Sequence, residues 1–486
     1  MKSLFARKPI SLIMEEPEEG GHKLKRVLGP WNLISLGIGV VIGAGIFVLS
    51  GQVAANYAGP AIVLSLIFSA VGCALAGLCY AEFASMIPMA GSAYTYAYAT
   101  MGEFIAWIIG WDLVLEYLFG ASTVAVGWSG YVVSFLQDFH ITIPAAFAQS
   151  PFTYSAITGW HASGAVLNFP AVFIVGLMTT LLVIGIRESA NFNNFIVVLK
   201  IVVILLFIGF GVFFIKVANW VPFIPVNAGH FGVFGWSGVI RGAGVIFFAY
   251  IGFDAVSTAA QEARNPQRDM PIGILGSLCI CTVLFILMAG VLTGIMKYTS
   301  LSVPDPIAVA VNAAGPGLAW LRPFIKIGAI AGLSSVVLVL LMAQPRIFFS
   351  MARDGLLPSV FARVHPRFKT PYVPTILTGV VAIAVSGLFP INILGELVSI
   401  GTLLAFLIVC VCVLLLRYRH TEIPRVFRTP WVPFVPIAGA VITLLQMVFL
   451  PFDTWIRLLG WMAAGIVLYW FYGRRHSRLR AETNRT

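Results

Sequence analysis

Uncharged apolar segments of about twenty residues recur along this chain, and the first runs from Trp31 to Ser50. A helix of about twenty apolar residues is long enough to cross a lipid bilayer. Hydrophobic residues make up 59% of the 486 residues and charged residues only 10%, whereas soluble domains carry roughly 25% charged residues. The sequence therefore predicts a polytopic membrane protein built from helices.

Twelve segments are predicted to span the membrane. They cover residues 31–50, 60–81, 105–135, 169–185, 195–215, 235–260, 271–296, 323–349, 373–389, 393–416, 432–450 and 454–472. We expect an all-α protein with tails at 1–29 and 474–486, helices 1–5 at 30–217, helices 6–10 at 218–417 and helices 11–12 at 418–473. The third span is overlong, since no strong break occurs between Gly102 and Gln137, so a tilted or kinked helix is expected there.

The basic residues predict the orientation. With the N-terminus inside, most of the 30 Lys and Arg residues fall in the predicted cytoplasmic tails and loops, whereas the large external segment at 138–168 has none. This distribution follows the positive-inside rule and predicts a multi-pass protein of the plasma membrane with both termini in the cytoplasm. The net charge of +11 is thereby explained without a nucleic-acid partner. The N-terminal tail lacks the hydrophobic core of a signal peptide.

Four glycines interrupt the first span, in GIGVVIGAGIF at 37–47. Each glycine costs a helix about 1 kcal/mol relative to alanine. A helix that is broken at membrane depth accounts for them, because its freed backbone groups can serve a polar ligand in an internal cavity. The alternative is that Gly39 and Gly43 only permit close helix packing, as small residues four apart do in membranes.

The sixth span carries a similar group of glycines, at Gly242, Gly244 and Gly252. Broken helices at corresponding positions of two halves indicate an inverted repeat with a binding site between the halves. Spans one and six would begin the two halves of a five-plus-five repeat, and spans eleven and twelve would be additions.

The two predicted breaks suit a zwitterion. A half-helix that starts at a break presents N–H groups that favour a carboxylate, and the unwound carbonyls favour an ammonium group. The predicted N–H donors are those of Gly43, Ala44 and Gly45, and the predicted carbonyl acceptors are those of Val41, Ile42, Phe248, Ala249 and Ile251. Both charged groups of an α-amino acid sit on one carbon, so an amino acid is the expected ligand.

Lys200 lies in the middle of the apolar run FIVVLKIVVILLFIGF, from which its amine cannot easily reach the interface. An ionisable residue at this depth indicates a functional site, although a structural ion pair is the alternative. We predict that Lys200 carries a proton. Ser334 and Ser335 of span eight are candidate acceptors for the lysine, although serines in membrane helices more often bond to their own backbone.

Three acidic residues share the membrane interior. Asp112 and Glu116 are four residues apart and so share one helix face, and Asp254 follows the break in span six. We interpret Asp112 as an interfacial or helix-packing group. Glu116 and Asp254 are expected to face the central cavity, where they could pair with Lys200 or with a cationic substrate. Phe248 is either an aromatic gate over the substrate or a core residue.

Other chemistries find little support in the sequence. The six cysteines lie inside apolar spans without nearby histidines, so we expect packing residues, no metal, and no disulfide to a heavy subunit. HExxH and GxSxG motifs are missing, which argues against an enzyme, and the polar residues gather at one depth, unlike a channel lining. No cofactor is expected. The expected partners are the substrate, membrane lipids and, at most, a small accessory membrane subunit.

Several longer segments match a known family. They are IGAGIF at 42–47, YAEFASMIPMAGSAYTYAY at 80–98, GWDLVLEY at 110–117, FFAYIGFDAVSTAAQEARNPQRDMPIGI at 247–274 and QPRIFFSMARDGLLP at 344–358. In these, the chain resembles the amino acid, polyamine and organocation transporter superfamily and, within it, bacterial relatives of the cationic amino acid transporters.

The resemblance implies the leucine-transporter fold and alternating access. It places Lys200 where sodium-coupled members hold an ion, which fits proton coupling. It places residues 43–45 and 248–251 at the substrate backbone, with Glu116 and Asp254 at the polar centre of the pocket. Animal members of this branch move arginine, lysine and ornithine, whereas bacterial relatives can prefer small neutral amino acids such as alanine. An exchanger or a uniporter of the same fold is the alternative to proton symport.

Overall fold

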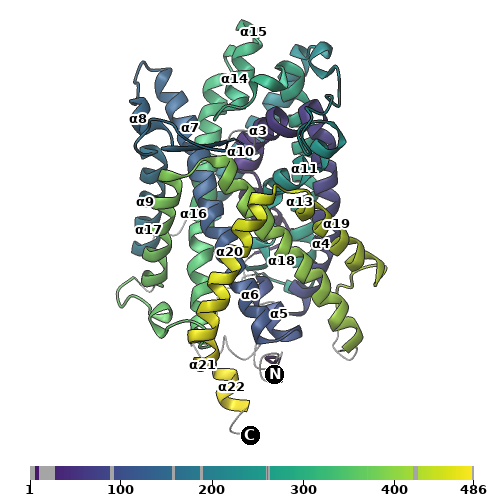
Figure 1. Cartoon of the computed structure of the whole chain (residues 1–486), viewed down its shortest axis with the longest axis vertical. Coiled ribbons are helices and arrows are strands. Elements are labelled where there is room, and N and C mark those ends of the chain that lie inside the picture. Colours follow the sequence, from purple (N-terminus) through teal and green to yellow (C-terminus); the bar gives the residue numbers. More distant parts are fainter. Residues whose placement is uncertain are drawn as a thin grey trace.

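The computed structural model describes residues 6–9, 28–87, 92–155, 159–185, 190–258, 260, 263–368, 370–419 and 425–483. Its helices form one elongated bundle whose long axes run in roughly the same direction (Figure 1). Within the described residues, helical structure occupies every one of the twelve predicted segments.

Thirteen helices of the described chain, named here in chain order, make up the bundle. They are α2 (Pro30–Val41), α4 (Ile62–Met86), α6 (Glu103–Val114) with α7 (Gly120–Gln137), α9 (Phe169–Ile184), α10 (Ala190–Gly211), α11 (Gly235–Ile246), α13 (Pro266–Ile295), α16 (Arg322–Arg353), α17 (Tyr372–Leu388), α18 (Ile391–Arg419), α19 (Phe434–Phe449) and α20 (Phe452–Leu468). Shorter helices connect them: α3 (Ser50–Val53), α5 (Ser92–Thr100), α8 (Ala145–Ala148), α12 (Ala255–Thr258), α14 (Pro306–Ala313), α15 (Pro316–Ala319), α21 (Arg474–His476) and α22 (Arg478–Thr483).

Seven helical stretches in the described part of the chain are long and apolar enough to cross a membrane, and four further apolar helices are shorter. The shorter ones are α2, α9, α17 and α19. The prediction of a helical polytopic membrane protein is therefore confirmed, while the count of twelve crossings stays a prediction.

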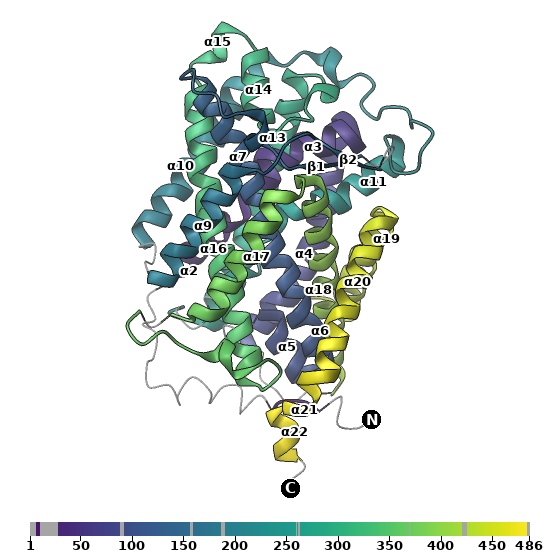
Figure 2. The same cartoon turned by 60° about the vertical axis from the view of Figure 1, so that its left-hand side comes forward.

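One short segment departs from the expected all-α fold. The strands β1 (Phe152–Ser155) and β2 (Gly159–Ala162) form an antiparallel hairpin, with Tyr154 opposite Trp160. Aromatic and β-branched residues favour strands, and this segment lies beyond the apolar helices, so its backbone need not be helical. Figure 2 shows the hairpin near the end of the bundle that carries α14 and α15.

The third predicted span is a helical stretch of unusual length, as expected. α6 continues into α7 through one π-helical turn, Leu115–Phe119, and the whole stretch runs from Glu103 to Gln137. A π-helical turn inside an α-helix changes the direction of its side chains and often marks a functional site. Glu116 lies in this turn.

The two ends of the described chain meet at one residue. Lys8 Nζ lies 2.7 Å from a carboxylate oxygen of Asp354, and the backbone N–H of Arg478 donates to the carbonyl of Asp354 at 3.1 Å. These contacts lie at the end of the bundle where α21 and α22 are found, opposite α14 and α15 (Figure 1). Termini at the same end fit an even number of crossings.

Candidate functional site

The first broken helix is present where the glycines predict it. α2 ends at Val41, and Ile42 adopts an extended conformation with φ −75° and ψ 90°. A π-helical segment, Gly45–Leu49, then resumes the path and leads into α3. The first N–H groups of such a segment have no acceptor within their own helix, so residues 43–45 can present them to a ligand.

The second broken helix is the partner of the first. α11 ends at Ile246 and is followed by a 3-10 turn, Phe247–Tyr250, after which Ile251 is extended. Gly252 has φ +110°, a conformation that other residues rarely adopt, and a Cβ at this position would lie 2.4 Å from Val40 Cγ1. Glycine is thus required at position 252 for its conformation and for the close approach of the first helix.

The two broken segments touch each other. A Cβ at Gly45 would lie only 2.2 Å from Ala249 Cα, so the backbones cross with no room for a side chain. At Gly43, by contrast, the nearest atoms to a Cβ would be those of Val336, at 3.4 Å. Close packing and a break therefore coexist in this glycine-rich stretch. Gly45 is required for the packing, whereas a Cβ at Gly43 would make only ordinary van der Waals contacts.

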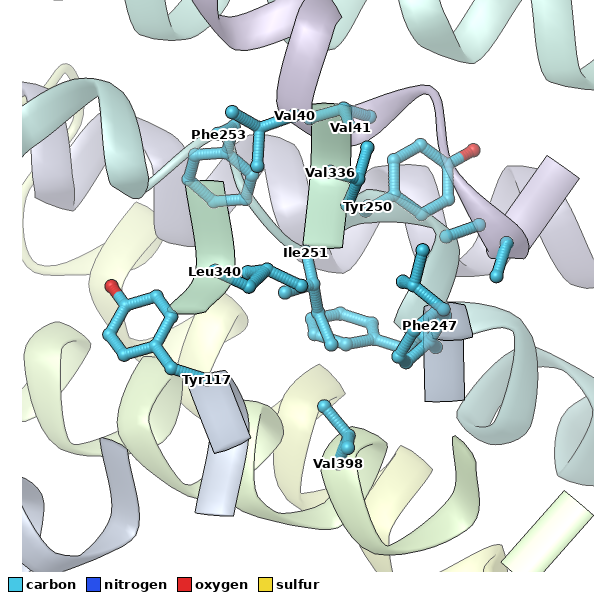
Figure 3. Packing of buried hydrophobic residues seen from close by; sticks show 14 of the residues in the cluster. Val40, Val41, Tyr117, Phe247, Tyr250, Ile251, Phe253, Val336, Leu340 and Val398 are labelled. Atoms are coloured by element: carbon cyan, nitrogen blue, oxygen red, sulfur yellow. The ribbon is translucent and has the colours of Figure 1, made fainter. Parts of the chain in front are cut away.

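A small pocket lies beside this crossing. It is lined by Val40, Val41, Gly43, Ala44, Gly45, Val124, Phe248, Ile251, Val336 and Leu340. Figure 3 shows Ile251 near the centre, with Leu340 beside it and Val40, Val41 and Val336 above. The free volume is ≈ 10 Å³, about enough for one water molecule. An amino acid can enter only if the surrounding helices move apart.

Six predicted substrate residues line this pocket: Val41, Gly43, Ala44, Gly45, Phe248 and Ile251. Ile42 and Ala249 are their buried neighbours in the two breaks. The carbonyl of Phe248 accepts a 3.1 Å hydrogen bond from the N–H of Ile251, so one of its two lone pairs is already engaged.

The acidic residues are buried but do not line the pocket. Glu116 and Asp254 are 1% and 0% exposed, and Asp254 accepts a 3.1 Å hydrogen bond from Tyr117 Oη. Asp112 is buried too, and a Cβ at Gly401 of α18 would lie 3.0 Å from its Oδ1. Asp112 thus packs between helices, which agrees with the helix-packing interpretation made from the sequence. The pocket walls that face a substrate side chain are consequently apolar.

Lys200 is fully buried and contacts the first broken helix. Its Nζ donates a 2.6 Å hydrogen bond to the carbonyl oxygen of Gly39, in the last turn of α2. Gly332 of α16 makes room for the lysine, because a Cβ there would lie 2.8 Å from Lys200 Cε. The lysine chain therefore joins α10 to α2 and passes across the face of α16.

The two serines of α16 differ in their contacts. Ser334 Oγ donates to the carbonyl of Ile330 at 2.8 Å and accepts a bond from Trp128 Nε1 at 2.8 Å, so it bonds to its own backbone. Ser335 lies three residues from Gly332, on the same helix face as the lysine contact. Its buried Oγ has no hydrogen-bond partner among the described residues. It could therefore accept a hydrogen bond from the Lys200 ammonium group if that group moved away from Gly39.

Several lining residues have no signal in the sequence. Val40, Val124, Val336 and Leu340 line the pocket, but they are ordinary apolar residues of apolar spans. Only the packing of α2, α7 and α16 around the breaks distinguishes them from lipid-facing residues. Among the described residues, no group of three or more His, Cys, Asp or Glu could hold a metal ion.

Two broken membrane helices that enclose a pocket at their crossing define a class of protein, the secondary transporters. The chain belongs to the amino acid permease family, whose model matches residues 28–471. This membership confirms the resemblance seen in the sequence, and it shows a transporter and not an enzyme.

Similar proteins cover nearly the whole chain. The chain is 47% identical to the methylthioribose transporter of Bacillus subtilis (strain 168) over 99% of this chain and 100% of that protein. It is 42% identical to a branched-chain amino acid permease of the same organism, over 98% of this chain and 99% of that protein. It is 39% identical to the vacuolar cationic amino acid transporter 4 of Arabidopsis thaliana, over 86% of this chain and 68% of that protein.

Proposed function

We propose that this protein is a proton-coupled symporter of L-amino acids in the plasma membrane. It would have twelve spans with a five-plus-five inverted repeat, both termini in the cytoplasm, and would work by alternating access. The observation that carries the proposal is the 2.6 Å bond from buried Lys200 to the carbonyl of Gly39, one residue before the pocket-lining Val40. A protonatable group thereby holds the helix that lines the ligand pocket.

The backbone of the two breaks suits the charged ends of an amino acid. The N–H groups at residues 43–45 start a half-helix and favour the carboxylate, and carbonyls of the unwound residues at 41–42 and 251 favour the ammonium group. Both breaks border one pocket, so a single α-carbon can reach both.

The pocket walls favour an aliphatic, neutral side chain. Val124, Val336 and Leu340 present only hydrocarbon, and Glu116 and Asp254 lie outside the lining. A cationic side chain would lose its hydration here without a facing carboxylate, which is costly. The similarity to a branched-chain amino acid permease, at 42% identity, agrees with this choice over arginine or lysine.

The coupling step would follow from the lysine contact. Protonated Lys200 holds the end of α2 and favours the substrate-binding, outward-facing state. Loss of the proton toward the cytoplasm removes the charge that strengthens the bond to the Gly39 carbonyl, and α2 can then move to open the inner side. A switch of this kind requires contacts that differ between the two states, and the lysine supplies one.

Uptake into proteoliposomes tests the coupling. Lys200→Ala should abolish amino acid accumulation driven by an inward proton gradient, whereas Lys297→Ala, at an exposed lysine, should not. A melting curve shows that both variants fold. Proton-driven accumulation by folded Lys200→Ala would refute the coupling role.

The alternative within the family is an exchanger or a uniporter, in which Lys200 only replaces a structural cation. Uptake into empty vesicles separates these possibilities. A symporter should accumulate substrate when a pH gradient is imposed, a uniporter should only equilibrate it, and an exchanger should need amino acid inside the vesicles.

A second candidate substrate is methylthioribose, because the chain is 47% identical to a transporter of that compound. The apolar pocket would accept its methylthio group, but the compound lacks the carboxylate that a half-helix N-terminus favours. Melting curves with the common amino acids and with methylthioribose, at mildly acidic and neutral pH, distinguish the two, since a ligand of the folded state raises the melting temperature. No shift with any amino acid would contradict the proposal.

A further inference from the structure

A buried carboxylate connects four elements at the end of the bundle opposite the termini. Glu396 of α18 is 2% exposed. Its Oε1 accepts a hydrogen bond from Tyr57 Oη at 2.9 Å, and its Oε2 accepts one from Thr454 Oγ1 at 2.9 Å. Arg457 Nη1 lies 3.4 Å from the same Oε2. None of these residues belongs to the substrate pocket or to the lysine contact.

Tyr57 belongs to the part of the first broken helix beyond the break. It lies in the π-helical segment Ala54–Ala58, and its carbonyl accepts a 2.8 Å bond from the N–H of Phe234, at the start of α11. A Cβ at Gly238 of α11 would lie 2.2 Å from that carbonyl oxygen. This half of the first helix and α11 therefore pack as one unit. Tyr57 supplies one hydrogen bond from this unit to α18, and Ser399 Oγ of α18 supplies another by donating to the carbonyl of Val245 in α11 at 3.0 Å.

The other contacts of Glu396 come from α20. Thr454 and Arg457 lie in this helix, and the Arg457 guanidinium also lies 5.5 Å from the ring of Tyr154 in the β1–β2 hairpin. Tyr154 Oη donates to Asp453, and its carbonyl accepts a 3.0 Å bond from Asn392 of α18. Figure 2 shows α20 along the outside of the bundle beside α18. If Tyr57 moves away, Glu396 therefore still has the hydroxyl of Thr454 as a hydrogen-bond donor and the guanidinium of Arg457 as a cation.

We propose that the Tyr57–Glu396 hydrogen bond is the latch of the outer gate, with both as positioning residues, and that α20 holds the carboxylate ready for Tyr57 to return. The proposal rests on the proposed transport function and orientation. In this proposal, outward opening separates the unit of Tyr57 and α11 from α18, so this bond breaks together with the bond of Ser399 to Val245. Because α20 still pairs with Glu396, opening does not leave a buried charge unpaired, which would otherwise be strongly unfavourable.

Cysteine labelling on intact cells tests the latch. A reporter, Val124→Cys in the pocket wall, is placed in a chain whose six native cysteines are replaced by alanine, and a membrane-impermeant thiol reagent is added outside. Tyr57→Phe removes only the donor and should raise the labelling rate about tenfold, which corresponds to about 1.4 kcal/mol. Tyr298→Phe, in the turn after α13, is the matched control and should leave the rate unchanged.

Transport kinetics add an independent readout in the protein without the reporter. A larger outward-open population should lower KM for external substrate and lower Vmax, because the binding-competent fraction rises. Loss of folded protein alone would lower Vmax with KM unchanged. If Tyr57→Phe does not fold, Glu396→Gln, which keeps an acceptor and removes the charge, is measured in the same way.

Unchanged labelling and unchanged KM in the folded variant would overturn the latch. The proposed function fails separately: if no ligand shifts the melting temperature of the parent protein, the substrate assignment is wrong, while the labelling rates still report on the gate.

Discussion

Lys200 of α10 donates a 2.6 Å hydrogen bond to the carbonyl oxygen of Gly39, 161 residues earlier in the chain. Gly39 lies among the last four residues of α2, whose carbonyls lack donors within the helix. The lysine therefore completes the end of a broken helix in place of the next helical turn. A charged ammonium group donates a stronger hydrogen bond than a neutral amine, so under the proposed coupling the charge of the lysine affects how firmly the end of α2 is held.

The space around the lysine chain gives the first prediction. Gly332→Ala would bring a Cβ to 2.8 Å from Lys200 Cε and 3.0 Å from Cγ. The lysine must shift, and its bond to Gly39 should weaken. We expect proton-driven uptake to fall at least about tenfold, equivalent to about 1.4 kcal/mol. Gly460→Ala, where no atom lies within 4 Å, is the control, and equal uptake by the two variants would contradict the prediction.

The second prediction concerns the crossing of the two broken helices. Gly45→Ala meets the backbone of Ala249 at 2.2 Å, and a backbone cannot move aside as a side chain can. We expect a loss of about 3 kcal/mol or more in folding stability and little folded protein by size-exclusion chromatography. Gly43→Ala meets only ordinary contacts at 3.4 Å, so it should fold, but its methyl group enters the pocket and should raise KM. A well-folded Gly45→Ala protein would argue against this close crossing.

The third prediction concerns the apolar wall of the pocket. Leu340→Ala enlarges the pocket by several carbon atoms, and a single methylene in such a pocket is worth about 1 to 3 kcal/mol. We expect the ratio of kcat/KM for leucine to that for alanine to rise by at least about tenfold, by the same estimate. Competition uptake with the two amino acids measures the ratio. An unchanged ratio would show that position 340 does not read the substrate side chain.

The fourth prediction concerns an ion pair at the end of the bundle near the termini. Glu82, at the end of α4, is fully buried and accepts two 2.9 Å bonds from Arg417 of α18, with Arg425 at 3.3 Å. Arg417→Ala should destabilise the protein by about 3 kcal/mol, since a buried carboxylate loses its bidentate partner. Arg419→Ala, at an exposed arginine, should leave the melting temperature within about 1 °C. Melting curves in detergent compare them.

Most of the helical framework and both breaks could be predicted from the sequence, because a bilayer offers no hydrogen bonds to the backbone and tolerates few charges. Clustered glycines such as Gly43 and Gly45 therefore indicate a break. A lone lysine such as Lys200 indicates a functional group at membrane depth. The β1–β2 hairpin was not predicted, because its segment lies beyond the apolar spans and is not subject to this constraint.

By itself, the sequence determined the membrane setting, the two interruptions and the buried cation, since each depends on residue type and depth alone. Only the tertiary structure decided that Gly39 accepts the bond from Lys200. It also decided that Val336 and Leu340, and not Glu116, line the pocket. The reason is physical: apolar residues in an apolar span carry no local signal of whether they face lipid, a neighbouring helix or a ligand, and only helix packing makes that distinction.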